Sequence, residues 1–163
     1  FYLAIAHMPE DAINLFDEEG AALAGTAYGS ISLFLSSALQ GNAEAAVKHV
    51  TPQLEQAATW TEYLALFLAD GYSLLGDRDL AMKWLRAAVA QGFINYPYLA
   101  ARDPFLVNVR SDPRFSELIR KVKPRWQALA QTPIEVKQAS DGVEIQEEMS
   151  EHLDQRDQTG AGT

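Results

Sequence analysis

The sequence predicts an all-α fold built from antiparallel helix-turn-helix units. Apolar residues recur at helical spacing almost throughout the chain as far as Trp126. Two glycine corners, Gly41 and Gly76, are 35 residues apart, and the small residues Ala46 and Ala81 recur at the same interval. A corner and a small residue that recur together indicate an internal repeat, and repeated helical hairpins must stack to bury their apolar faces.

The ends of the expected helices carry recognisable signals. Gly41-Asn42 and Gly76-Asp77 end apolar helices with residues that tolerate turn conformations. Asp103-Pro104 and Asp112-Pro113 place a capping carboxylate before a proline at the first helical position, where the missing N–H costs nothing. Thr51-Pro52 predicts a kink or an early stop inside the third helix. The expected helices are 10–18, 21–40, 43–57, 61–75, 78–91 and 113–130, with a short helical turn at 104–109.

Charge is distributed unevenly along the 163 residues, which carry a formal net charge of −9. Residues 1–132 hold 14 acidic and 11 basic residues, whereas 133–163 hold 8 acidic and 2 basic residues. Nucleic acid is not an expected partner, because phosphate binding needs a cationic surface.

The chain has no cysteine, which excludes disulfides and thiolate metal sites and fits a reducing, cytoplasmic compartment. It begins at Phe1 inside an apolar run, which predicts that it is part of a longer protein.

The segment from Gly20 to Asn42 carries no charge and invites comparison with a membrane span. Its Gly25-x-x-x-Gly29 spacing is also found between packed transmembrane helices. The segment is a poor match for the apolar interior of a bilayer, however, because it contains several hydroxyl side chains. A helix buried between neighbouring helices lacks charge for the same reason. We therefore predict a buried helix and no membrane insertion.

Residues from about 27 to 130 resemble the tetratricopeptide repeat (TPR) family, most strongly from Tyr63 onward. The residues that carry the resemblance are Leu68-Ala69-x-x-Tyr72, Ala81-x-x-x-Leu85 and Ala88. It implies a right-handed stack in which small residues mark the closest helix contacts and larger residues fill the space between successive hairpins. The usual tryptophan of the first helix is replaced by Ala65 and the closing proline by Phe93. An earlier and weaker copy keeps the pattern at Leu33, Ala46 and Val50.

The runs DPFLVNVR and SDPRFSEL, at 103–118, resemble the terminal unit that closes TPR arrays in bacterial multidomain proteins such as serine/threonine kinases. The resemblance implies a capping unit whose apolar residues cover the last hairpin. Those residues are Phe105, Leu106, Val109, Phe115, Leu118, Ile119, Val122 and Trp126. The expected organisation is a partial preceding hairpin at 1–26, two TPR-like repeats at 27–95, capping helices at 96–132 and an acidic tail at 133–163.

The tail has a different composition from the rest of the chain, without aromatic residues and rich in charge. Ile134 and Val136, the turn signal Asp141-Gly142, and the alternation that follows favour a small hairpin. The competing interpretation is an amphipathic helix over 144–155, which we favour. A tail without regular structure is the third alternative.

No sequence motif for catalysis or metal binding is present. His7, His49 and His152 are too far apart to form a local metal site, and the chain has neither a phosphate-binding glycine loop nor a nucleophile elbow. Carboxylate clusters at 17–19 and 147–148 are more often solvated surface than acid–base pairs. We therefore predict that the chain is not an enzyme and takes no cofactor.

Two surfaces are candidates for partner binding. The first helix of each hairpin would line the concave side of the stack, where extended peptides or partner helices bind. The candidate residues there are Glu62, Tyr63, Phe67, Asp70 and Tyr28. The alternative for Phe67 and its neighbour Leu66 is contact with a helix of the same stack. A basic face of the last helix is either a docking site for an acidic or phosphate-bearing partner or a solvated helix surface. Its residues are Arg114, Arg120, Lys121, Lys123 and Arg125.

The predicted function is protein–protein interaction or scaffolding, as the C-terminal docking or sensor region of a larger bacterial signalling protein. A protein or peptide is the expected partner. One alternative is a small-ligand-sensing or enzymatic domain with a pocket in the concave groove. The other is a structural module that forms a homo-oligomer by pairing apolar faces.

Overall fold

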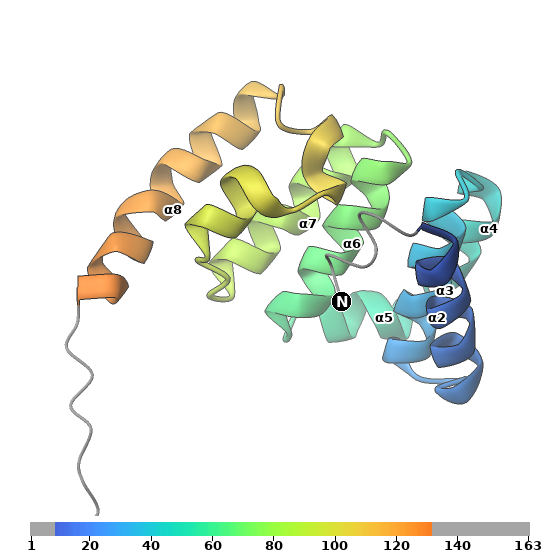
Figure 1. The fold of residues 1–163 in the computed structure, drawn as a ribbon. Coiled ribbons are helices and arrows are strands. Elements are labelled where there is room, and N and C mark those ends of the chain that lie inside the picture. The colour runs from blue at the N-terminus through green and yellow to red at the C-terminus, as the bar shows by residue number, and fades with distance from the viewer. Residues whose placement is uncertain (1–8, 132–163) are drawn as a thin grey trace, which may run out of the picture. The chain divides into compact units, whose positions relative to one another are not determined.

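A computed structural model of the chain describes residues 9–131, which lie within one compact unit that ends at Gln131. Every regular element among these residues is helical, so the all-α prediction is confirmed (Figure 1). The elements are α2 (Pro9–Ala22), α3 (Ala27–Leu39), α4 (Ala43–His49), α5 (Pro52–Ala58), α6 (Glu62–Leu74), α7 (Arg78–Ala90), η1 (Tyr98–Arg102), η2 (Phe105–Asn108) and α8 (Pro113–Gln131). The predictions for 133–163 and for the two terminal histidines lie outside the described residues.

The predicted helix 21–40 is wrong at its start, because a turn separates α2 from α3. Gly25 adopts a left-handed conformation with φ of 81°, and the Thr26 hydroxyl accepts a hydrogen bond from the Gly29 amide at 3.1 Å. A Cβ on Gly29 would lie 2.2 Å from the Leu23 carbonyl oxygen. The two glycines therefore make a tight turn and a close backbone approach. None of the described helices combines the length and the apolar character needed to cross a membrane.

The break expected at Thr51-Pro52 is confirmed. Helix α4 ends at His49 and a separate helix, α5, begins at Pro52. The Thr51 side chain accepts a hydrogen bond from the Leu54 amide at 3.1 Å, as an N-cap does. The proline ends one helix and starts the next because its ring cannot continue the first and its fixed φ suits the second.

Both glycine corners have the predicted form. Gly41 and Gly76 have φ of 69° and 79°, in the left-handed region. The residue after each glycine caps the next helix: Asn42 accepts from the Ala45 amide at 3.1 Å and Asp77 from the Leu80 amide at 3.0 Å. The repeat seen in the sequence is thus a repeat of backbone conformation and capping.

The helices pack in an order that follows the chain. Helix α3 contacts α2, α4, α5 and α6, while α6 contacts α7 and η2, and α7 contacts α8. Helices α3 and α6 approach closely at Gly71, where a Cβ would lie 2.1 Å from Cε1 of Phe34. The Phe34 and Tyr72 rings lie 5.1 Å apart. The small repeat residues Ala69, Ala81 and Ala88 are fully buried.

The C-terminal segment covers the last hairpin with its apolar residues. Those that are buried are Phe105, Leu106, Val109, Phe115 and Val122, and Leu118 and Ile119 pack partly against the same core. The π-helical turn η1, which precedes the predicted turn, was not expected from the sequence. It places Tyr98 and Leu99 against the core, and Leu99 is fully buried.

Candidate functional site

An apolar groove lies on helices α2, α3 and α6, with a volume of about 250 Å³. We call it the α2–α3–α6 groove. It contains two of the predicted partner-binding residues, Tyr28 and Phe67. Its lining residues are Leu15, Phe16, Glu19, Leu23, Tyr28, Ile31, Ser32, Leu35 and Phe67.

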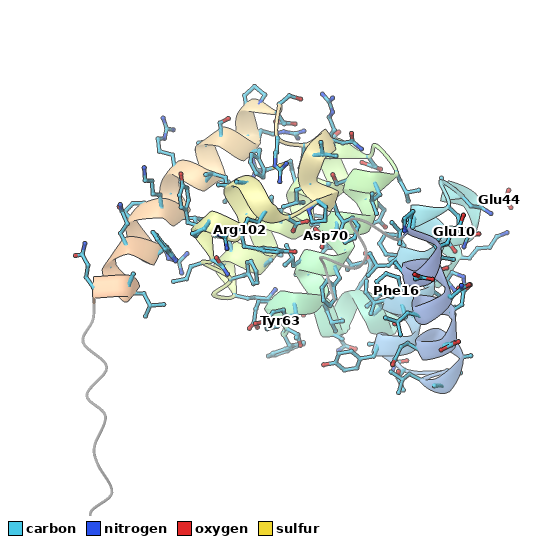
Figure 2. The ribbon with its side chains drawn as sticks, in the orientation of Figure 1. Glu10, Phe16, Glu44, Tyr63, Asp70 and Arg102 are labelled. Atoms are coloured by element: carbon cyan, nitrogen blue, oxygen red, sulfur yellow. The ribbon has the colours of Figure 1, made fainter. Side chains whose placement is uncertain are left out.

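The other predicted residues of α6 lie elsewhere. Tyr63 is 54% exposed and packs edge-on against Phe93, with ring centroids 5.8 Å apart. Figure 2 shows Tyr63 at the edge of the described unit, and Glu62 is half-buried in the first turn of α6. Leu66 is buried in the core, as the alternative interpretation expected for it, whereas Phe67 is half-buried and borders the groove. The structure therefore separates Tyr63 from the groove that holds Tyr28 and Phe67.

Asp70 does not belong to an open surface, which corrects the prediction for this residue. Its side chain is 0% exposed, in the middle of the described unit (Figure 2). Helical spacing from Tyr63 and Phe67 suggested a shared exposed face. The C-terminal half of α6 is instead covered by η2, and a partner cannot reach a carboxyl group at that depth.

Asp70 is paired with a second buried acid, Asp103, which lies just before η2 and is also 0% exposed. Burial raises the pKa of Asp70 well above its ordinary value, and the charge of Asp103 and a hydrogen bond to Asp103 raise it further. Burial also raises the pKa of Asp103, although hydrogen bonds from the Phe105 amide and from the Asp70 and Tyr98 side chains oppose that shift. Burial and the neighbouring charge of Asp103 therefore favour the protonated form of Asp70.

Further polar contacts hold the segment 103–110 on α6. The Ser73 hydroxyl donates to the Phe105 carbonyl at 2.6 Å, and the Asn108 amide donates to the Ser73 carbonyl at 2.9 Å. The Arg110 guanidinium donates to the Asp103 carbonyl at 2.6 Å. The two hydrogen bonds of Ser73 and the carboxyl pair form a polar seam between the cap and the helix. The Arg110 bond lies within the cap segment and stabilises its conformation. The sequence suggested capping by Asp103 but offered no signal for its partner.

The predicted basic face is divided by the structure into bonded and available cations. Arg114 binds Asp79 and Asp112, each at 2.7 Å, and Lys121 binds Glu117 at 2.7 Å. Arg125 donates to the Val89 carbonyl at 3.3 Å. Arg120 and Lys123 have no ion-pair partner within the described part of the chain.

Arg120 and Lys123 line a second cavity, of about 400 Å³, between η1 and α8. We call it the η1–α8 cavity. Arg110, which sequence reasoning did not select, is its third cation. Arg114 and Lys121 lie instead beside a smaller cavity of about 160 Å³ with Arg86. The five predicted cations thus do not form one docking face.

The buried carboxyl pair and the surface hollows differ in their access to a ligand. The Asp70–Asp103 pair resembles an acid–base dyad in composition, but both groups are sealed from any substrate. Between residues 9 and 131, no group of three His, Asp or Glu residues is placed to hold a metal ion. The α2–α3–α6 groove and the η1–α8 cavity are the larger of the three hollows described above, and both are open to a ligand.

No protein-family model, curated protein or solved structure matches the chain. Geometry therefore defines its class: an all-helical protein with an apolar groove on α2, α3 and α6 and a basic cavity beside α8.

Proposed function

We propose that residues 9–131 form a right-handed stack of TPR-like hairpins that serves as a protein–protein interaction or scaffolding module. Two features support the stack: the recurrence of glycine corner and cap at Gly41-Asn42 and Gly76-Asp77, and the packing of α3 on α6. The resemblance of the cap motifs supports a context at the C-terminus of a larger bacterial signalling protein, in the cytoplasm.

The α2–α3–α6 groove is the observation that carries the proposed function. Its rim includes Leu15, Leu23 and Tyr28, which are 41%, 39% and 56% exposed. Apolar side chains that are exposed around a hollow gain free energy when a partner covers them. A tyrosine beside such a hollow is also a frequent anchor of binding energy. A peptide or helix with apolar anchor residues fits this groove.

The charge of the residues around the groove indicates which charged side chains the partner carries. Residues 9–47 contain six carboxylates and no lysine or arginine, and one of these carboxylates, Glu19, lines the groove. A partner segment with lysine or arginine beside its apolar anchors would be steered toward this region, and an acidic segment would be repelled. We therefore propose a basic, amphipathic peptide segment as the occupant.

The test is selection of peptides from a displayed random library on the full chain, followed by titration of the selected peptides by fluorescence polarisation. We expect apolar peptides with basic flanks, and we expect Leu23→Ala and Tyr28→Ala each to weaken their binding roughly tenfold. The matched control is Leu129→Ala, which removes a leucine that is exposed on α8, outside the groove.

Three results would contradict the proposal. The library yields no binder; the selected peptides bind Leu23→Ala and Tyr28→Ala as tightly as the unmodified chain; or the peptides are predominantly acidic. Sedimentation of the chain alone tests the alternative that the groove mediates self-association. A dimer that dissociates in both groove variants would assign the groove to self-association instead.

A further inference from the structure

All of the charged side chains that line the η1–α8 cavity are basic. Arg110, Arg120 and Lys123 line it, and no acidic residue does. The nearby carboxylate of Glu117, which also interacts with Arg120, is bonded to Lys121 at 2.7 Å. Three cations that line one hollow attract an anion. Arg110 and Arg120 also interact with the carboxylates of Asp103 and Glu117, but neither carboxylate lines the cavity.

Two of these cations are held in place before any ligand binds. Arg110 donates from Nη2 to the Asp103 carbonyl at 2.6 Å, which fixes its guanidinium at one end of the cavity. The Lys123 ammonium lies over the Tyr96 ring, 5.6 Å from its centroid. Such positioning lowers the entropy lost when a ligand is bound.

The floor of the cavity is apolar. Phe115 is buried beneath it, Ile119 is half-buried, and Tyr96 forms a wall whose ring lies 6.0 Å from that of Trp126. A volume of about 400 Å³ falls within the range of small-molecule sites. An apolar floor beneath a cationic rim suits a ligand that has both an oxyanion and a hydrocarbon or aromatic body.

We propose that the η1–α8 cavity binds a small organic anion, in which a phosphate or carboxylate contacts Arg120, Lys123 and Arg110 while an apolar body lies on Tyr96, Phe115 and Ile119. The site is independent of the α2–α3–α6 groove, and it would let the cap region respond to a ligand while the groove holds a partner. Its ligand is acidic, whereas the peptide proposed for the groove is basic, so the two proposals are tested separately.

The experiment is an NMR titration of the full chain, labelled with ¹⁵N, against four probes: phenyl phosphate, benzoate, inorganic phosphate and phenol. We expect phenyl phosphate and benzoate to shift the amides of η1 and of residues 115–123 with saturation. Inorganic phosphate and phenol each supply half of the required chemistry, and we expect them to bind at least roughly tenfold more weakly.

The variants Arg120→Ala and Lys123→Ala should each weaken phenyl phosphate binding roughly tenfold, the loss expected for one charge-assisted contact. Lys83→Ala is the matched control, because Lys83 is an exposed lysine on α7 that pairs with Glu55 and does not line the cavity. Both Arg120 and Lys123 are exposed, so their removal leaves the core intact.

Each contrary result overturns a stated part of the proposal. If no probe shifts these amides, the cavity is not a ligand site. If inorganic phosphate binds as well as phenyl phosphate, the apolar floor has no role, and if phenol does, the cations have none. An equal loss in Lys83→Ala would mean that exposed cations attract anions without a defined site.

Discussion

Asp70 of α6 lies close enough to Asp103 for the charge of Asp103 to raise the pKa of Asp70, and both carboxyl groups are fully buried. Two neighbouring buried carboxyl groups cannot both ionise without a large cost, which favours a pair that retains one proton. The Arg110 charge and the Tyr98 hydroxyl act on Asp103, the member of the pair that is more readily ionised. A protonated carboxyl group is therefore favoured at the contact between the capping segment and α6.

That proton makes the stability of the chain depend on pH. The pKa of Asp70 is raised in the folded chain above its ordinary value of 3.8, so the folded state binds more protons than the unfolded state between the two values. Its contribution to the free energy of unfolding is therefore complete below pH 3.8 and is lost as pH rises through the raised native pKa.

We expect Asp70→Asn to remove this loss, because an amide of nearly the same shape replaces the carboxyl group and does not ionise. Relative to the unmodified chain, the variant should gain stability as pH rises, by up to about 1.4 kcal/mol per pH unit within the window. Urea unfolding at a series of pH values measures the difference. Asp11→Asn, at an exposed position in α2, is the control, and parallel pH profiles for Asp70→Asn and the unmodified chain would refute a shared proton.

The Ser73 hydroxyl is expected to stabilise the cap. Ser73→Ala removes the buried hydrogen bond of 2.6 Å from the Ser73 hydroxyl to the Phe105 carbonyl, which should cost about 1–3 kcal/mol. Hydrogen exchange should show the greatest loss of protection in η2. Ser32→Ala serves as the comparison, because its hydroxyl bonds only to the Tyr28 carbonyl of its own helix; equal costs for the two variants would deny the seam a special role.

Gly71 is expected to tolerate no side chain while Phe34 keeps its place. A Cβ at this position would lie 2.1 Å from Cε1 of the buried ring, so Gly71→Ala should destabilise the chain by about 1–3 kcal/mol through overpacking. In a Phe34→Leu background the same substitution should cost less, since the clashing atoms are gone. A double-mutant cycle measures that coupling, and a coupling energy near zero would show that α3 and α6 do not meet there.

Arg114 is expected to control the ionisation of Asp112. Hydrogen bonds from Arg114 lower the pKa of Asp112 from 3.8 to about 2. Arg114→Ala should return that pKa toward 3.8, as followed by NMR titration of the carboxyl carbon. Because the native pKa is depressed, the stabilising effect of Asp112 is present above pH 3.8 and is lost as pH falls toward 2. Arg120→Ala should leave the titration of Asp112 unchanged.

Much of the fold was predictable because its signals are local. The corners at Gly41 and Gly76, the break at Thr51-Pro52 and the caps at Asn42 and Asp77 each depend on backbone preferences within a few residues. The turn at Gly25-Thr26 was missed, although it carries the same kind of signal, because the uncharged segment around it was interpreted as one continuous buried helix.

The candidate sites were less predictable, because they depend on which elements meet. Spacing along α6 placed Tyr63, Phe67 and Asp70 on one face, but η2 covers the part of that face that holds Asp70. Spacing along α8 likewise placed five cations together. Their roles differ because Asp79, Glu117 and the Val89 carbonyl are within reach of only some of them.

Asp103 and Asp112 show which properties of a residue depend on the sequence and which depend on the tertiary structure. The sequence by itself determined that each precedes a proline, and this pattern predicted a capping carboxylate at a helix start. In the structure each accepts a hydrogen bond from the amide two residues later, at 3.0 Å and 2.8 Å. Only the tertiary structure decided that the pKa of Asp103 is raised beside Asp70 while that of Asp112 is lowered beside Arg114. A cap bond depends on the next two residues of the chain, whereas a pKa depends on burial and on charges from every part of the chain that folds against it.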